Sequence, residues 1–391
     1  MEPIPKAIKS RLTILVMSVI ILAGAQIRSQ PVTIDLIKGC ETKGSIKLSE
    51  IADHISYVKL ETTKDCLIGA HANKLYFYKN NWFIQQGRFL RFDSNGKFLN
   101  AISGRGKGPG EFIELSGAGF NAKNDHLYVI NRLTDQAMEF SLDGRLVGNI
   151  RNVSVKSIPL NNQYFVNSFP VNGLFLSDGY RITIVSLDGK IQKKLLKQDL
   201  AKMNAYIPII ASQLKVYQDS VTCWDAISDT IYRIGSDLNL TPRFILNFGK
   251  EAVPFYLRVP NNGPDVIPEL EKYSHVMSFI ESEKFLFFEV DRKGKFLGLL
   301  YDKSNGRCFS MDFGGKSIVN DLDPDFLFWP QGITDDGRLF MIADVADLKV
   351  RFAGSPANGN SSAETGKTLR KIVGNSKDDD NPILILLTPK K

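Results

Sequence analysis

A hairpin pattern that occurs five times along the chain constrains its fold more than any other feature. The first copy spans residues 90–99, where alternating apolar residues lead into the turn Ser94-Asn95-Gly96 and a second short apolar run. The Asn-Gly pair suits a type I′ turn, because that turn needs positive φ at both central residues. Further copies span residues 139–147, 184–192, 231–240 and 299–309. The pattern indicates a succession of antiparallel strand pairs.

The spacing of these hairpins indicates the architecture. Successive turn residues are separated by 48, 45, 50 and 67 residues, measured at Gly96, Gly144, Gly189, Asn239 and Gly306. An all-β unit repeated every ~40 to 50 residues has the length of a propeller blade. With a sixth unit that begins near residue 332, we predict an all-β fold, a six-bladed β-propeller with four-stranded antiparallel blades.

Two strands outside the repeats predict how the ring closes. Residues 56–62 alternate as a strand before the first complete repeat, and residues 381–389 form a clear strand after the last one. An unpaired edge strand is a liability. We therefore expect the N-terminal strand to complete the last blade.

The first residues have the pattern of a secretory signal. Lys6, Lys9 and Arg11 precede an apolar run over residues 12–23, and residues 23–25 form a small-x-small cleavage site. Twelve apolar residues are too short to cross ~30 Å of hydrocarbon, so a cleaved signal is favoured over a permanent anchor. No cysteine directly follows the apolar run, as a lipoprotein signal would require. We expect export to the periplasm or cell surface, with no transmembrane segment in the mature chain.

These features predict the domain organisation. Residues 1–25 are the signal peptide, the mature chain starts near Gln26, and residues 26–54 form an N-terminal extension with a short helix near Ser49. The propeller takes up residues 55–391. Within it we expect insertions at residues 197–206 and 250–274, and a flexible or partly helical insertion at about residues 353–380, which are rich in Gly, Ser, Asn, Lys and Asp.

Charge does not favour a nucleic-acid partner. Removal of residues 1–25 takes away three basic residues and Glu2, so the net charge falls from +7 to +5. No cluster of Lys and Arg has the interleaved aromatic residues that a nucleic-acid groove requires.

Four cysteines remain after processing: Cys40, Cys66, Cys223 and Cys308. They show no C-x-x-C spacing, which disfavours a zinc site. In an oxidising compartment a Cys40–Cys66 bridge is an alternative, whereas buried free thiols are the favoured interpretation.

Several segments resemble a known family. They are LETTKDCLIG, SGRGKGPGEF, SDTIYRI, NDLDPDFLFWP and DDDNPILIL. In this order they resemble the recurring motifs of the Bacteroidota six-bladed β-propeller family, relatives of the NHL-type propellers, over about residues 56–389. The resemblance implies the fold and an exported location. It supplies no reaction and no catalytic residues.

A glycine-rich run occupies residues 104–110. It matches neither nucleotide-binding glycine motif, because it follows a hairpin and opens no helix. The favoured interpretation is a crossover between blades. The alternative is an anion-binding nest made by Arg105, Gly106, Lys107 and Gly108.

Asp321, Asp323 and Asp325 have the D-x-D-x-D spacing of a calcium loop. The sixth and twelfth positions are Phe326 and Gly332, which depart from the EF-hand pattern. Turn chemistry is therefore favoured over a structural site for Ca²⁺ or another divalent ion, which stays open as the alternative.

Residues at strand ends and in the adjoining loops give the ligand-binding candidates. They are Trp224, Asp225, Arg88, Arg132 and His275. Loops on one face of a propeller converge on its channel, where aromatic faces and a few polar groups hold ligands. An indole beside a carboxylate, as in Trp224-Asp225, suits a sugar or a peptide.

Catalytic motifs are absent from the sequence. There is no G-x-S-x-G and no H-E-x-x-H, so we predict no catalytic residue and no cofactor. We predict a non-enzymatic binding or scaffold module for a glycan, peptide or protein partner. The alternative is a metal-dependent lyase or lactonase-like enzyme with its site in the central channel, which would need several converging His, Glu, Asp or Asn side chains.

Overall fold

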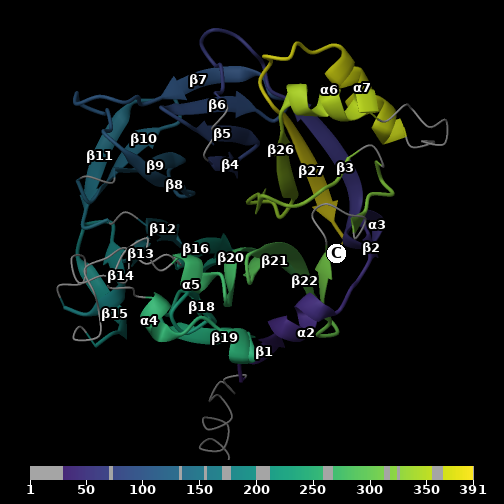
Figure 1. Ribbon diagram of the computed structural model, residues 1–391. Helices are drawn as coiled ribbons and strands as arrows, with labels where there is room; N and C mark the ends of the chain where they lie inside the picture. Colours follow the sequence, from purple (N-terminus) through teal and green to yellow (C-terminus); the bar gives the residue numbers. More distant parts are fainter. Residues whose placement is uncertain are drawn as a thin grey trace, which may run out of the picture.

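The computed structural model shows six β-sheets arranged as blades around a central axis (Figure 1). It describes residues 30–69, 74–131, 134–153, 156–169, 178–199, 212–258, 267–311, 318–323, 326–354 and 364–390. The predicted six-bladed propeller is confirmed. The signal-peptide region lies outside the described residues, and none of the described helices is long and apolar enough to cross a membrane.

Each of the first five blades is a meander of four consecutive antiparallel strands. Blade one contains β4 (Lys74–Tyr78), β5 (Asn81–Gln85), β6 (Phe89–Asp93) and β7 (Phe98–Ile102). Blade two contains β8 (Leu115–Asn121), β9 (His126–Asn131), β10 (Gln136–Ser141) and β11 (Leu146–Arg151). Blade three contains β12 (Lys156–Leu160), β13 (Tyr164–Ser168), β14 (Tyr180–Ser186) and β15 (Ile191–Lys197). Blade four contains β16 (Gln213–Tyr217), β17 (Ser220–Asp225), β18 (Thr230–Ile234) and β19 (Leu240–Asn247). Blade five contains β20 (Ser274–Glu281), β21 (Phe285–Arg292), β22 (Lys295–Asp302) and β23 (Cys308–Met311). The first strand of each lies nearest the central axis (Figure 1).

Blade six joins the two ends of the chain. Its strands follow the order β25 (Gly332–Ile333), β26 (Leu339–Ala343), β27 (Ile383–Pro389) and β3 (Ala52–Lys59). The N-terminal strand β3 pairs antiparallel with the C-terminal strand β27, from Lys59 opposite Ile383 to Ala52 opposite Pro389. The predicted closure of the ring is therefore confirmed.

The first hairpin turn differs from the predicted type I′ turn, because Gly96 has positive φ and Asn95 does not. The Gly96 N–H donates to the Asp93 carbonyl (3.0 Å) and the Asp93 N–H donates to the Lys97 carbonyl (2.9 Å), which is a three-residue loop with glycine in the left-handed position. Gly96 has φ +85°, and a Cβ atom at this position would lie 2.2 Å from the carbonyl oxygen of Lys59. Glycine is therefore required here both by the backbone conformation and by the close approach of blade six.

The hydrophobic core lies between neighbouring blades. Tyr78 of β4 and Phe120 of β8 stack with ring centroids 4.4 Å apart, and Phe83 of β5 packs on Phe120 at 4.8 Å. Because every blade buries both faces against its neighbours, the second strands have little alternation. All six residues of β17 are buried, for example.

The N-terminal extension crosses blades four, five and six on the outside of the ring. Strand β1 (Val32–Asp35) adds to β19 in parallel, as a fifth strand of blade four. Helix α2 (Leu36–Glu41) packs beside β23, β2 (Ile46–Lys47) pairs with β24 (Ile318–Val319), and α3 (Leu48–Ile51) precedes β3. Residues 30–51 are called the N-terminal strap below. The short helix expected near Ser49 is confirmed as α3, whereas the sequence did not predict β1.

The insertions carry short helices. Between blades four and five lie η2 (Gly249–Glu251), α4 (Phe255–Arg258) and α5 (Ile267–Leu270). Helices α6 (Val345–Gly354) and α7 (Glu364–Gly374) lie at the outer edge of blade six (Figure 1). The region expected to be flexible or partly helical thus contains α7, which buries Leu369 and Val373. Most of the insertion expected at residues 197–206 lies outside the described residues.

All four cysteines are free thiols. The alternative of a Cys40–Cys66 bridge is wrong, because the two side chains pack in different places. Cys40 on α2 packs among residues of blades four and five, and Cys66 packs in a cluster made by blades one and six.

Candidate functional site

One face of the ring brings together charged side chains from several blades. We call it the inlet face and define it as the face on which the innermost strands β4, β8, β12, β16 and β20 begin. Hydrogen bonds connect neighbouring blades there: Lys156 Nζ donates to the Ser212 carbonyl (3.3 Å), and Gln213 Nε2 donates to the Met277 carbonyl (2.6 Å). Because neighbouring strands of a blade are antiparallel, the second strand ends and the third strand begins at the face where the first strand begins. The end of β17 and the start of β14 therefore lie at the inlet face.

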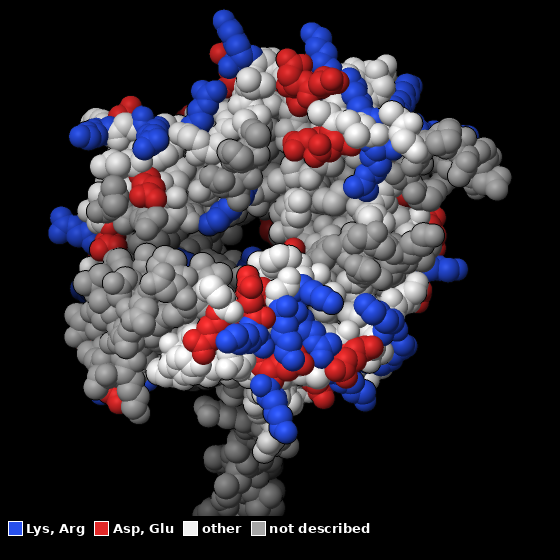
Figure 2. Space-filling model, viewed as in Figure 1, with Lys and Arg blue, Asp and Glu red and all other residues white. Residues whose placement is uncertain are grey.

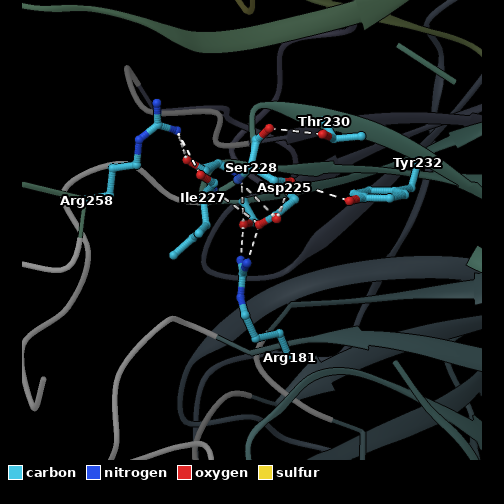
Figure 3. A network of polar contacts seen from close by, with 9 residues as sticks. Arg181, Asp225, Ile227, Ser228, Thr230, Tyr232 and Arg258 are labelled. Carbon is cyan, nitrogen blue, oxygen red and sulfur yellow. Dashed lines mark hydrogen bonds and ion pairs between the residues drawn. The ribbon is translucent and has the colours of Figure 1, made fainter. Parts of the chain in front are cut away.

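A buried ion pair between Arg181 of β14 and Asp225 of β17 joins blades three and four at the inlet face. Arg181 Nη1 bonds Asp225 Oδ1, and both side chains are 2% exposed. Arg181 Nη2 also donates to Ser212 Oγ (2.5 Å). In Figure 3 Arg181 reaches the carboxylate from one side, and Ile227 and Ser228 approach it from the other. Ser228 Oγ donates to Asp225 Oδ2 at 2.7 Å.

The surroundings of Asp225 keep it ionised. Burial alone would raise the pKa of this carboxyl, but the charge of Arg181 and the hydrogen bonds from Ser228 and Arg181 outweigh burial. The pKa of Asp225 therefore lies below its ordinary value.

A second buried arginine, Arg258 of α4, holds the loop that follows Asp225. Its Nη1 donates to the Ala226 carbonyl (2.5 Å), its Nε to the Val253 carbonyl (2.7 Å), and its Nη2 to Asp229 Oδ2 (2.5 Å). Burial raises the pKa of Asp229 in spite of this arginine. Two guanidinium groups, one from blade three and one from the insertion between blades four and five, thus fix residues 225–229.

Several buried polar atoms of blades three to five have no hydrogen-bond partner. Among the described residues, five buried side-chain atoms have no hydrogen-bond partner, and four of them lie on the inlet face of blades three to five: Arg181 Nε, Gln213 Oε1, Trp224 Nε1 and His275 Nδ1. The fifth belongs to Asn161, in the turn between β12 and β13. An unpaired buried polar atom costs about 1–3 kcal/mol, so each of these atoms requires an explanation.

His275 is uncharged at neutral pH in this arrangement. Burial lowers its pKa, the charge of Arg258 lowers it further, and Asp291 opposes the shift. A neutral imidazole has one donor and one acceptor nitrogen. The four unpartnered groups therefore offer both donors and an acceptor.

The ligand-binding candidates from the sequence are only partly brought together. Trp224, Asp225 and His275 lie in this region, but Trp224 is 1% exposed and offers no open indole face. Arg88 lies in a loop of blade one, where its Nη2 donates to the Asp65 carbonyl (2.5 Å). Arg132 lies outside the described residues.

Sequence reasoning missed Arg181, Ser212 and Lys156. A charged residue beside the start of an apolar strand was the available signal for Arg181 and Lys156. Ser212 had no signal, because its role depends on contacts from blade three.

The glycine-rich run holds one of the chain's own carboxylates. Gly108 N–H donates to Glu111 Oε2 (2.7 Å), and a Cβ atom at Gly106 would lie 1.9 Å from the same oxygen. The Glu111 carboxylate thus occupies the space beside the backbone of Gly106 and Gly108.

The aspartates of the D-x-D-x-D run bind the N-terminal part of the chain. Asp321 Oδ1 accepts from the Ser49 N–H (2.9 Å), and Asp321 Oδ2 accepts from Ser49 Oγ (2.5 Å). Asp323 is fully buried and bonds Tyr57 Oη. Asp325 lies outside the described residues. Within the described part of the chain, no three His, Cys, Asp or Glu side chains are grouped to hold a metal ion.

Comparison with known proteins identifies relatives of the fold. The family model described as "Domain of unknown function (DUF4934)" matches residues 31–388. No curated protein matches the chain. A crystal structure from Bacteroides fragilis, described as a candidate exported protein, is similar with a TM-score of 0.73 and 20% identity, covering 93% of this chain and 100% of that one. A member of the duf4221 family from Bacteroides vulgatus is similar with a TM-score of 0.50 and 7% identity, covering 87% of this chain and 97% of that one. At these identities the likeness shows the fold alone.

Proposed function

This chain belongs to the DUF4934 family, and we propose that it is an exported β-propeller that binds a glycan, peptide or protein partner through its inlet face. The family description names no activity, so the proposal rests on the site. The ligand lies over blades three to five, where side chains of three blades meet.

The unpartnered buried atoms of blades three to five carry this proposal. Arg181 Nε, Gln213 Oε1 and Trp224 Nε1 come from blades three and four, and His275 Nδ1 comes from blade five. Buried polar groups in folded proteins are almost always hydrogen-bonded, and those that are not often mark a position for a ligand or an ordered water. A ligand with hydroxyl or amide groups supplies what they lack.

The rigidity of the site supports binding as well. Arg181 and Arg258 fix residues 225–229 through ion pairs and carbonyl contacts, so the ligand meets groups that are already ordered. A preorganised site loses less conformational entropy on binding. Export is supported by the signal-like sequence of residues 1–25 and by the description of the relative from Bacteroides fragilis.

The test is a binding screen on the mature protein from Gln26 onward, with a glycan array and a peptide library as probes. Trp224→Phe removes one unpartnered N–H group with a small change in volume. Trp82→Phe is the matched control, since Trp82 is equally buried but its Nε1 donates to the Ser94 carbonyl (3.4 Å) away from the site.

We expect the wild type to bind at least one probe, and Trp224→Phe to weaken that binding by about 5- to 100-fold, the equivalent of one buried hydrogen bond. Trp82→Phe should bind as the wild type does. The proposal is overturned if the wild type binds no probe, or if Trp224→Phe, Gln213→Met and His275→Phe all bind as tightly as the wild type.

A further inference from the structure

Three lysines from three blades surround the opening at the centre of the ring. Lys74 begins β4 of blade one, Lys156 begins β12 of blade three, and Lys215 lies on β16 of blade four. These are the innermost strands of their blades. Figure 2 shows an opening along the axis with blue cationic side chains at its rim and a smaller red area.

Two of these lysines are held in place by carbonyl groups of the neighbouring blade. Lys74 Nζ donates to the Ser116 carbonyl (2.8 Å), and Lys156 Nζ donates to the Ser212 carbonyl (3.3 Å). An ammonium group has three N–H donors, so each of these lysines retains donors for a ligand.

Lys215 has no hydrogen bond or ion pair within the described residues. The carboxylate of Glu289 on β21 attracts it from a distance, and Ser278 Oγ already donates to Glu289 Oε2 (2.5 Å). Among the described residues, Glu289 is the one carboxylate whose charge shifts the pKa of any of the three lysines.

Electrostatic repulsion among the lysines, and from Arg181, lowers the pKa of two of them. Burial lowers the pKa of Lys74, and the charges of Lys215 and Lys156 lower it further. Burial and the charge of Arg181 lower the pKa of Lys156. Lys74 is nevertheless exposed to solvent. Exposure together with a lowered pKa is expected of a side chain in a narrow water-filled channel.

Uncompensated cations of this kind destabilise a folded protein unless an anion binds them. Blades one and four lie on opposite sides of a six-bladed ring, yet Lys74 and Lys215 are close enough to repel each other. A recess lined by one sign of charge concentrates ions of the opposite sign.

We propose that the mouth of the central channel is an anion site, in which Lys74, Lys156 and Lys215 bind one oxyanion group of a sugar held on the inlet face. The oxyanion is a carboxylate, sulfate or phosphate. Lysine binds all three as a point charge, without the fixed fork of arginine. This inference rests on the proposed function and names its ligand class as an acidic glycan.

A sugar fits better than a peptide because of what lies beside the lysines. Lys156 and Arg181 both bond Ser212, so the anion site adjoins the unpartnered atoms Arg181 Nε and Gln213 Oε1. Arg181 Nε requires an acceptor and Gln213 Oε1 requires a donor. A hydroxyl group supplies both, and a sugar carries hydroxyls next to its acidic group.

The experiment measures affinity by isothermal titration calorimetry at constant ionic strength. The probes are inorganic sulfate, inorganic phosphate, acetate, glucuronate, glucose and a glutamate-containing dipeptide. The proteins are the wild type, Lys74→Gln, Lys215→Gln and the control Lys190→Gln, whose side chain is 78% exposed and pairs only with Asp188 in the described structure.

We expect glucuronate to bind more tightly than acetate or glucose, and each channel variant to weaken it by about tenfold or more. Lys190→Gln should bind as the wild type does. Binding of inorganic sulfate or phosphate without any gain from a sugar shows an adventitious ion only, and tighter binding of the dipeptide shows an acidic peptide ligand. Both results overturn the glycan assignment.

Failure of this inference can be told apart from failure of the proposed function. If Trp224→Phe weakens binding of a neutral glycan while Lys74→Gln and Lys215→Gln do not, the inlet face binds its ligand but the lysines play no part. If no probe of either screen binds, both proposals fail.

Discussion

Arg181 of blade three forms a buried ion pair with Asp225 of blade four, and each side chain is 2% exposed. The same guanidinium donates to Ser212, the residue that precedes β16. One arginine thus fixes both the end of β17 and the start of β16, so the blade interface and the candidate site depend on the same contacts.

Replacing Asp225 with Asn should strongly destabilise the protein. Arg181 would remain buried without a counter-charge, and breaking a buried pair in this way costs about 3–5 kcal/mol. Asp188→Asn is the control, because the Lys190–Asp188 pair is on the surface and contributes about 0–1 kcal/mol. Chemical denaturation measures both free energies of unfolding. Equal effects of the two substitutions would show that the buried pair does not stabilise the blade interface.

Acid should destabilise the protein through carboxylates whose pKa is lowered on folding. Hydrogen bonding from Arg292 is the main cause that lowers the pKa of Glu251 from 4.5 to about 2. Such a group stabilises the folded state above its unfolded pKa, and this stabilisation is lost as the pH falls from about 4.5 to about 2. In Glu251→Gln the free energy of unfolding should fall less steeply over that range. An unchanged slope would contradict the assignment.

The sequence predicted the blades because each hairpin is a local structure. Gly96 and the residues around it specify a turn and two strands without help from the rest of the chain. Strand β27 was predictable for the same reason. Strand β1 was not, since its residues join blade four only after β19 is in place.

The sequence pointed to some residues of the candidate site. Trp224, Asp225 and His275 were chosen as strand ends, and strand ends of neighbouring blades do meet on one face. Lys74 and Lys215 were not predicted, because each is an ordinary strand lysine until ring closure sets blade one opposite blade four. The D-x-D-x-D run contains Asp321, whose partner Ser49 is 272 residues away. No local pattern could show that pairing.

Removing one channel lysine should stabilise the protein in the absence of ligand. Lys74→Met relieves repulsion from Lys215 and Lys156, so the melting temperature should rise at low ionic strength, as is common when a functional site is neutralised. A base whose pKa is lowered on folding destabilises the folded state below that pKa, and the effect disappears as the pH rises to 10.5. The difference between variant and wild type should therefore shrink at alkaline pH. A lower melting temperature for the variant would show that Lys74 has a structural role.

The cysteines should be unreactive in the native protein. Burial raises the pKa of Cys40 to about 11 and the pKa values of Cys223 and Cys308 to about 12, and a thiol without thiolate character alkylates slowly. Intact mass after iodoacetamide treatment should show no addition to the native protein and four additions after unfolding. Fewer than four additions to the unfolded, unreduced protein would show a disulfide.

The N-terminal strap should contribute to the stability of the ring. Leu36 of α2 is fully buried in the cluster between blades four and five, so Leu36→Ala should cost about 2–5 kcal/mol. Val32 of β1 is 46% exposed, and Val32→Ala should change stability by no more than about 0.5 kcal/mol. Denaturant unfolding monitored by tryptophan fluorescence compares the two, because Trp224 lies in the same cluster as Leu36. A single transition that shifts in Leu36→Ala shows that the strap unfolds together with the ring. An unshifted transition would show that the strap detaches first, and that blades four and five hold together without it.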